Sequence, residues 1–407
     1  MEMKNIQIKL KPLLFLFVLG IAFSSCSTSD DSETDPDTPA EVFIIDYNID
    51  SDTVLTNHLP GVDYEICGSI DIKANLIIEP GVEIVMCAGS RITIERDGSL
   101  NAVGSNASPI IFRGKTASPG FWQVLHFNSN NPSNELNHVV IADGGGANSF
   151  ENATIWVNDN NAGQLTLKNS TISNSKGIGL LVEGIASIPN FSNNTFSNNG
   201  DSPVSIAMSN IGALDVASNY ADGNTKNQVY VKNATVNQPQ MVKNINVPYL
   251  IKGSSDIKSD LKLEPGVRFL MSSGAVIDVN NSGSMNALGT SNKPITIKGE
   301  VDAVGYWAHI HFNSNNPLNK FTHVNIKNGG SRSSYKYSSI WVNDNNNGSF
   351  NMTDCTIADS YGWGVYVENG ATMIPSTKSE VESVNTFINN GSGTNADCTD
   401  TCSIYLP

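Results

Sequence analysis

The sequence predicts an all-β fold, a coil of short parallel strands built from a tandem duplication. Distant segments match closely at one constant offset, apolar runs of three to five residues recur, and turns rich in Asn, Gly, Ser and Pro separate these runs. The apolar residues alternate with period two, as in half-buried strands, and no amphipathic helix of ordinary length is expected after residue 40. We therefore expect each strand to pair with its counterpart one coil later.

The duplication is clearest in two phrases, TIWVNDNN from Thr154 and SIWVNDNN from Ser339. The same offset relates LIIEPGVEIV to LKLEPGVRFL, SLNAVG to SMNALG, and the two occurrences of HFNSNNP. After a few inserted residues the agreement resumes, with NTFSNNG matching NTFINNG. A repeat that keeps one offset without a gap up to this insertion indicates two related halves of one chain.

Either a copied binding site or a copied structural corner would explain the repeated phrase. If Ile155 and Val157 point into the coil, Trp156 falls on the outer face, under a neighbouring loop. Asn158, Asp159 and Asn160 then form the corner, where Asn side chains of successive coils can stack into hydrogen-bonded ladders. We favour the structural explanation, because the fold itself requires such residues at its corners.

The N-terminal segment, residues 1–25, predicts a secretory signal peptide. An apolar run from Leu13 to Phe23 follows three Lys residues. As a helix it would cover about 16 Å, well short of a bilayer core of about 30 Å. The segment ends in FSSC, which resembles the lipobox of bacterial lipoproteins. This resemblance implies that Cys26 becomes the lipid-bearing N-terminus.

Residues 26–41 are rich in Asp and Glu and poor in large apolar side chains. Such a stretch cannot bury enough surface to fold, so it predicts a disordered tether. An acidic run directly after a lipidated Cys also resembles the surface-export signal of Bacteroidetes lipoproteins. That resemblance implies a protein anchored in the outer membrane by its lipid and displayed at the cell surface.

The rest of the chain is expected to form one continuous coil. Copy one with its joining coils is assigned to residues 42–237, and copy two to residues 238–407, because the joining stretch still alternates apolar and polar residues. The net charge is −15, and the five Arg residues are scattered. Nucleic acid is therefore not expected as a partner, since neutralising its phosphates needs a basic face.

The spacing of several motifs resembles a known fold family. LIIEPGVEI is followed by SLNAVG, PIIF, a Trp and HVVIADGG. This pattern resembles the right-handed parallel β-helix of the pectate-lyase-like superfamily, and in particular β-helix lipoproteins of Bacteroidetes. β-Sandwich domains fit less well, because the strands are very short and no hairpin turns of the right length separate them.

The catalytic motifs of the enzymes with this fold are not found. Pectate lyases use clustered Asp with calcium and an Arg base, and polygalacturonases use motifs of the type NTD, DD, GHG and RIK; the chain from residue 42 on contains none of these strings. Each copy offers one corner carboxylate, Asp159 or Asp344, whereas glycoside hydrolysis usually needs two, about 5–10 Å apart. An acid pair across coils stays open, so a polysaccharide lyase or glycoside hydrolase is the alternative to a non-catalytic protein.

Candidate ligand-binding residues come mainly from differences between the copies. Tyr337 and Tyr366 replace Asn152 and Leu181, and exposed aromatic faces commonly pack against sugars. We add three residues of the repeated phrases, Trp341, Asp159 and Asp344, as weaker candidates.

Three His residues on the outer parity, His309, His311 and His323, could approach one another and bind a transition metal. No Cys or carboxylate stands in obvious support. We therefore predict no metal and no cofactor.

The cysteines predict two disulfides. Cys67 and Cys87 are separated by about one coil, and both are missing from copy two, where Lys252 and Ser272 stand. A bonded pair explains this joint absence, and export permits oxidation. Cys398 and Cys402 are expected to close a short loop, and Cys355 to remain a free, buried thiol.

These features together predict a lipid-anchored surface rod with a binding or scaffolding role and no catalysis. Its expected partners are the membrane, through the lipid, and a polysaccharide or another surface protein. The aromatic residues unique to copy two suit contact with a sugar chain better than proton transfer.

Overall fold

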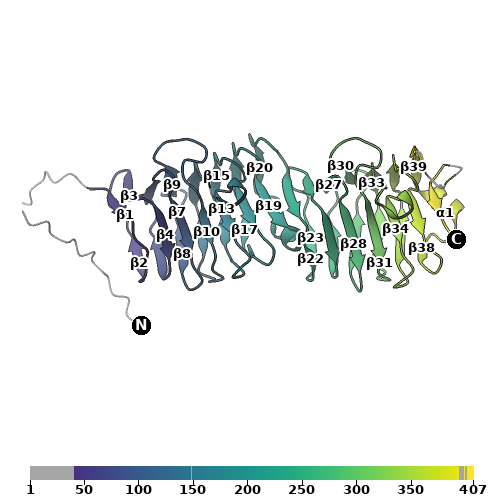
Figure 1. Ribbon diagram of the computed structural model, residues 1–407, viewed down its shortest axis with the longest axis horizontal. Coiled ribbons are helices and arrows are strands. Elements are labelled where there is room, and N and C mark those ends of the chain that lie inside the picture. The colour runs from purple at the N-terminus through teal and green to yellow at the C-terminus, as the bar shows by residue number, and fades with distance from the viewer. Residues whose placement is uncertain (1–40, 148, 394–397, 399–400) are drawn as a thin grey trace, which may run out of the picture.

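The computed structural model describes residues 41–147, 149–393, 398 and 401–407, and these form an elongated rod of stacked coils (Figure 1). The strands lie in five sheets, which we name A to E, and neighbouring strands in each sheet are parallel. The predicted fold class is therefore confirmed: the protein is an all-β parallel β-helix.

Three sheets enclose the first half of the rod. Sheet A contains β1 (Phe43–Ile45), β3 (Val62–Ile66), β6 (Glu83–Met86), β9 (Ile110–Gly114), β12 (Val139–Ala142), β15 (Thr171–Ser173), β18 (Thr195–Ser197) and β20 (Asn219–Asp222). Sheet C contains β2 (Thr53–Leu55), β5 (Asn75–Ile78), β8 (Ser99–Val103), β11 (Glu135–Asn137), β14 (Thr166–Lys168) and β17 (Phe191–Ser192).

Sheet B runs through both halves. It contains β4 (Ser69–Ile72), β7 (Arg91–Ile94), β10 (Leu125–Phe127), β13 (Ile155–Val157), β16 (Leu180–Val182), β19 (Val204–Ala207), β21 (Val229–Lys232), β24 (Tyr249–Ile251), β27 (Arg268–Met271), β30 (Ile295–Gly299), β33 (Val324–Lys327), β36 (Thr356–Ala358) and β39 (Thr386–Ile388).

Sheets D and E complete the second half. Sheet D contains β22 (Thr235–Val236), β25 (Ser254–Ile257), β28 (Val276–Asn280), β31 (His309–Asn313), β34 (Ile340–Val342), β37 (Val365–Val367) and β40 (Ile404–Tyr405). Sheet E contains β23 (Gln240–Val242), β26 (Asp260–Leu263), β29 (Ser284–Leu288), β32 (Lys320–Thr322), β35 (Ser349–Thr353) and β38 (Thr372–Ile374).

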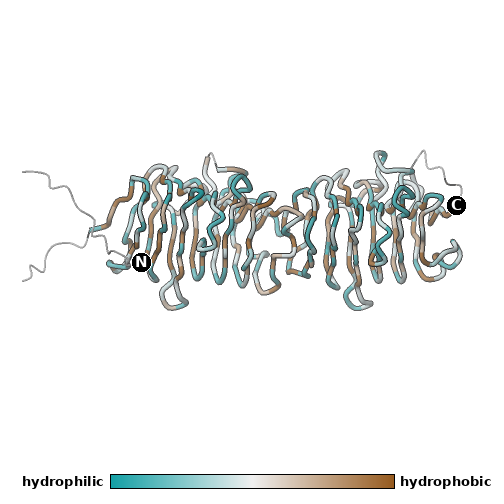
Figure 2. Tube along the Cα trace, turned by 90° about the horizontal axis from the view of Figure 1, so that it is seen from below, coloured by the Kyte–Doolittle hydropathy of each residue, from teal (hydrophilic) through white to brown (hydrophobic). Residues whose placement is uncertain are grey.

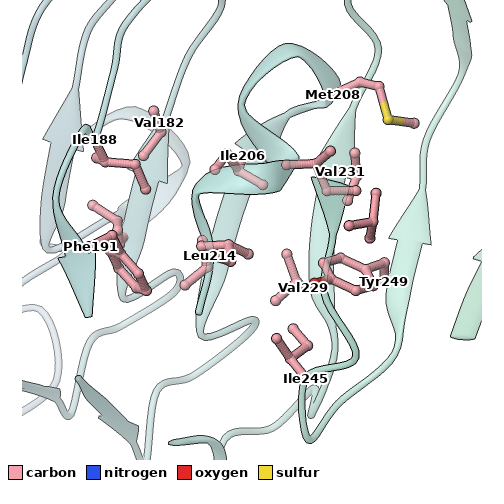
Figure 3. Packing of buried hydrophobic residues seen from close by; sticks show 14 of the residues in the cluster. Val182, Ile188, Phe191, Ile206, Met208, Leu214, Val229, Val231, Ile245 and Tyr249 are labelled. Atoms are coloured by element: carbon pink, nitrogen blue, oxygen red, sulfur yellow. The ribbon is translucent and has the colours of Figure 1, made fainter. Parts of the chain in front are cut away.

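Alternating side chains build the core inside the coil. Leu125 and Phe127 of β10 are fully buried, while His126 between them points outward. Apolar residues recur in this way in coil after coil along the rod (Figure 2). The core continues across the join of the two copies, where Leu214 and Tyr249 are buried in one cluster (Figure 3). Each such side chain stabilises the fold by about 1.5–3 kcal/mol.

The two copies do not use the same sheets. β4 and β25 are equivalent strands of the duplication, but β4 belongs to sheet B and β25 to sheet D. Along sheet B, seven steps lead from β4 to β24, and β25 is the next strand in the chain. The offset between equivalent strands of the two copies is thus seven full coils plus one step to the next sheet of the coil. The strand that carries Trp156 therefore lies in sheet B, and its copy with Trp341 lies in sheet D.

Coil length varies because loops of different size join the strands. A single step along sheet B takes the chain from Tyr249 to Arg268 in one coil, but from Arg91 to Leu125 in another, which is a much longer stretch of sequence. Four short helices interrupt the described coils: η1 (Phe150–Asn152), η2 (Met208–Ala213), η3 (Tyr335–Tyr337) and α1 (Lys378–Val384). Of these, α1 lies in the residues inserted into copy two.

Asn side chains at the corners bond successive coils together. Asn199 is 1% exposed, and its side-chain oxygen accepts a hydrogen bond from the Ser175 backbone N–H. Its amide group donates to the oxygen of Asn224 one coil later. In the repeated phrase, however, Asn158 accepts from the backbone N–H of Asn160, a local turn, and the ladder contact is made by Asn161 to Asn128. The Asn ladder expected at the corner that begins with Asn158 is thus formed by Asn161 instead.

The two predicted cysteine pairs lie at disulfide distance. Cys67 and Cys87 follow the paired strands β3 and β6, with Cα atoms 4.9 Å apart, and Cys398 is joined to Cys402. Cys355 is a free, buried thiol, as expected.

Residues 1–40, and with them Cys26, lie outside the described residues, so the signal peptide, lipidation and tether remain predictions. Within the described ranges, no helix combines the length and apolar character needed to cross a membrane.

Candidate functional site

The outer face of sheet D carries a row of ring side chains, one from each of four successive coils. Backbone pairing sets His311 beside Trp341, Trp341 beside Tyr366, and Tyr366 beside Tyr405. The Tyr366 and Tyr405 rings are stacked, with centroids 4.6 Å apart and planes 6° apart. In β34 and β37 the ring lies between two buried apolar residues, and this alternation points it outward.

Trp341 is enclosed on both faces of its indole ring. His311 stacks on it with a centroid distance of 3.9 Å, and Tyr335 of η3 stacks on it at 4.6 Å. Two rings at these distances can only lie on opposite faces. Trp341, a predicted ligand-binding residue, can therefore meet a ligand only with the edge of its ring.

A groove of about 520 Å³ opens beside this row. Its aromatic walls include Tyr335 and Tyr405, which are 41% and 37% exposed. Asp344 and Glu368 line the same groove. Three amides complete the polar rim, those of Asn343, Asn345 and Asn369. The groove thus combines partly exposed rings with hydrogen-bonding groups, the combination that binds small polar molecules with an apolar face.

The carboxylate beside the Trp is oriented differently in the two copies. In copy one, Trp156 Nε1 donates to Glu183 Oε2 at 2.7 Å. In copy two, the equivalent Glu368 instead accepts a hydrogen bond from the Asp344 backbone N–H at 3.1 Å. The nitrogen Nε1 of Trp341 is buried and has no hydrogen-bond partner. The partial desolvation of Tyr335 and the Glu368 charge raise the pKa of the Tyr335 phenol.

A second groove, of about 510 Å³, lies on the other side of Tyr335. Tyr337, Arg332 and Lys336 line it, and the Tyr337 ring contacts Tyr361 edge-on at 5.5 Å. The two predicted sugar-contacting tyrosines, Tyr337 and Tyr366, therefore lie in different grooves, with Tyr335 and Trp341 forming the wall between them.

The structure brings two of the three predicted His residues together: the rings of His309 and His311 meet edge-on, with centroids 6.1 Å apart, whereas His323 lies on another sheet. His309 bonds Ser334 at 3.0 Å, and burial lowers its pKa to about 4. His311 bonds Asp278 at 3.0 Å, and its ring is stacked on Trp341. His323 follows β32 in sheet E, in the turn before β33. In the described part of the chain, the compact metal-ligating set is instead Glu65, Cys67 and Cys87, whose two sulfur atoms are bonded to each other.

The corner carboxylates Asp159 and Asp344 are about seven coils apart, roughly 34 Å at 4.8 Å per coil, so they form no acid pair. The carboxylate near Asp159 is that of Glu183. Burial raises the pKa of Glu183, and the charge of Asp159 adds to this shift. The Asp159 carboxylate itself packs against the backbone of Gly184, where a Cβ would clash with it.

Among the residues of the groove on sheet D that were not predicted from the sequence as ligand-binding are Tyr335, Glu368 and Tyr405. Tyr335 replaces Phe150, a change that keeps the ring and adds only a hydroxyl, so it gave little signal. Glu368 matches Glu183 and is equally inconspicuous. Tyr405 lies beyond the matching segments, and only the sheet pairing reveals its place in the row.

Comparisons with protein-family models, with curated proteins and with solved structures give no match to this chain. The functional interpretation therefore depends on the geometry of the site.

Proposed function

We propose that the protein is a non-catalytic rod, anchored to the outer membrane by lipid at Cys26, that binds carbohydrate in the groove on sheet D. The observation that carries this proposal is the groove itself, in which Tyr335, Tyr366 and Tyr405 border the Asp344 and Glu368 carboxylates. Sugars present apolar C–H faces and polar hydroxyl groups, and the groove offers a counterpart to each.

The proposed location depends on the N-terminal sequence. The apolar run, the FSSC motif and the acidic stretch that follows resemble those of exported Bacteroidetes lipoproteins. Protease added to intact cells is expected to degrade the protein, and a Cys26→Ala variant is expected to be released from the membrane fraction. A protein that is protected in intact cells would contradict surface display.

Carbohydrate binding is tested with the full mature chain carrying Cys26→Ala, so that no lipid is attached. We expect binding to a glycan array, followed by calorimetry on the best ligand. The Tyr335→Ala, Tyr366→Ala double variant should lose at least about tenfold in affinity, since aromatic contacts contribute about 0.5–1.5 kcal/mol each beyond their area. Phe150→Ala, at the position in copy one that matches Tyr335, is the control. Absence of binding to any glycan would contradict the proposal.

The second candidate function, glycoside hydrolysis or lyase activity, is favoured by two carboxylate pairs across coils. These are Asp159 with Glu183, whose pKa is raised, and Asp344 with Glu368 in the groove on sheet D. Glu183 already accepts a hydrogen bond from Trp156. Incubation with neutral and acidic polysaccharides, with and without calcium, should therefore yield no new reducing ends and no unsaturated products. Turnover that is abolished by Glu183→Gln, Asp159→Asn, Glu368→Gln or Asp344→Asn would establish the enzyme instead.

A further inference from the structure

We propose that the groove selects neutral sugars over uronic acids, and that Trp341 Nε1 and the Glu368 carboxylate together hold one sugar hydroxyl group. This inference rests on the proposed carbohydrate binding and adds its chemical specificity. Its first basis is a buried polar atom that has no hydrogen-bond partner within the protein.

This atom is Nε1 of Trp341. It is buried and has no hydrogen-bond partner, and Trp341 lines the groove. A ligand in the groove therefore reaches this nitrogen only after the side chains that cover it turn aside. A buried donor without a partner is costly, and native proteins rarely keep one. In copy one the equivalent Trp156 has a partner, Glu183, at 2.7 Å. Copy two therefore lacks the Trp–Glu hydrogen bond of copy one, and a ligand group that accepts a hydrogen bond would give the Trp341 N–H a partner.

The second group is the Glu368 carboxylate. The Asp344 backbone N–H and the Tyr335 phenol already bond to it, and a carboxylate, which has about four lone pairs, keeps further acceptor sites. A hydroxyl group both donates and accepts. One sugar hydroxyl can therefore accept from Trp341 Nε1 and donate to Glu368, while the exposed rings of Tyr335 and Tyr405 contact the C–H face of the sugar.

Charge decides which sugars can bind. Asp344 and Glu368 line the groove, and no Lys or Arg is found among the described residues that line it. Arg332 and Lys336 line the other groove, beyond Tyr335, and of these two Lys336 also acts through its charge on Tyr335 and Tyr366. A uronic acid would bring a third carboxylate next to two that stay in place, and like charges in one site reject a ligand. A neutral sugar meets no such repulsion.

The first experiment compares matched ligands by calorimetry on the full mature chain carrying Cys26→Ala. The probes are glucan, mannan and galactan oligosaccharides, each in its neutral form and with C6 oxidised to the uronate. We expect at least one neutral form to bind about tenfold more tightly than its oxidised form. Equal binding of the two forms would overturn the inference and leave carbohydrate binding intact, whereas no binding of any probe would overturn both.

The second experiment tests the two groups. Trp341→Phe keeps the stacked ring and removes the N–H, and it should weaken binding of the neutral probe about tenfold, the loss expected for one hydrogen bond. Trp156→Phe, the matched change in copy one, should leave affinity within about twofold. Glu368→Gln should narrow the difference between neutral and oxidised probes. Unchanged affinity in Trp341→Phe, together with loss in the Tyr335→Ala, Tyr366→Ala variant, would overturn the hydroxyl contact alone.

An NMR measurement on the parent protein keeps the test independent of folding defects. The chain has five Trp residues, so the indole N–H signals can be assigned by single substitutions. On addition of the neutral probe, the Trp341 indole signal should shift and its hydrogen exchange should slow, with the Trp156 signal unchanged. Saturation with probe without any change at Trp341 would contradict the inference.

Discussion

The two copies have equivalent strands around Trp156 and Trp341, but only in copy one does the Trp N–H bond to the neighbouring Glu. In copy one, Glu183 accepts the Trp156 N–H, and the neighbour in the next coil is the buried Leu181. In copy two, Tyr366 takes the place of that Leu, the matching carboxylate turns away, and a groove opens. The repeated phrase therefore maintains the coil, while the residues around it, which differ between copies, determine what the surface can bind.

The largest effect is expected from the buried Trp residues that the copies share. Trp122 and Trp307 are fully buried, and each donates its N–H to a backbone carbonyl, of Ala142 and Lys327. Trp122→Ala and Trp307→Ala should each lower the free energy of unfolding by about 3–5 kcal/mol, measured by denaturant titration and by hydrogen exchange in the coils concerned. If one copy loses much less than the other, the two cores are not equivalent.

Removal of the disulfide in copy one should be the next largest effect. The Cys67→Ser, Cys87→Ser variant should lose about 3 kcal/mol, because the bond closes a loop with a sequence separation of 20 and restricts the unfolded chain. Hydrogen exchange should speed up in β3 and β6. The equivalent strands of copy two, β24 and β27, lack the bond and should keep their exchange rates. A change of equal size in both copies would show that the rod responds as a single unit.

Acid should destabilise both copies, but through different His positions. Burial lowers the pKa of His126 in copy one, and of His309 in copy two, from 6.5 to about 4. The neutral form is favoured in the folded protein, so each His contributes stability above pH 6.5 that is lost as the pH falls towards 4. The loss is on the order of 3 kcal/mol per residue, because each pKa unit corresponds to about 1.4 kcal/mol. His126→Gln and His309→Gln should each flatten the stability profile between these pH values.

The smallest expected effect concerns the carboxylate that closes copy one. Burial raises the pKa of Glu183 above its usual 4.5, so the folded state holds the proton more firmly than the unfolded state. Stability should therefore fall as the pH rises from 4.5 through the folded-state pKa. Glu183→Gln should remove this slope and change stability by no more than about 1 kcal/mol. A slope that persists in the variant would assign it to another group.

The sequence was sufficient for the fold but only partly for the site. Alternation in LHF and IWV defines which residues enter the core, and the spacing of Cys67 and Cys87 matches one coil. The outward position of Trp341 follows from the same alternation. These are local properties, which a period of two residues fixes directly.

The groove could not be read from the sequence, because it depends on register between distant coils. Tyr405 joins Tyr366 only through the pairing of β37 with β40. The constant offset between the copies suggests that equivalent strands lie in the same sheet. In the structure this offset is seven full coils plus one step to the next sheet, so equivalent strands enter different sheets. The Asp344 backbone N–H and the Tyr335 phenol bond to Glu368, and the Trp341 N–H does not, which sequence patterns do not reveal.

The Asn-rich corners also determine how the protein ages. An Asn followed by Gly deamidates when the next backbone nitrogen attacks its side-chain carbonyl. Asn199 precedes Gly200, but its carbonyl and amide are held by bonds to neighbouring coils, so it should persist. Asn347 precedes Gly348, and its residue is exposed on the turn that begins with Asp344, beside the groove. Asn369 precedes Gly370 and is exposed beside the same groove. Deamidation should therefore begin at these two Asn-Gly pairs and add negative charge next to the proposed binding site.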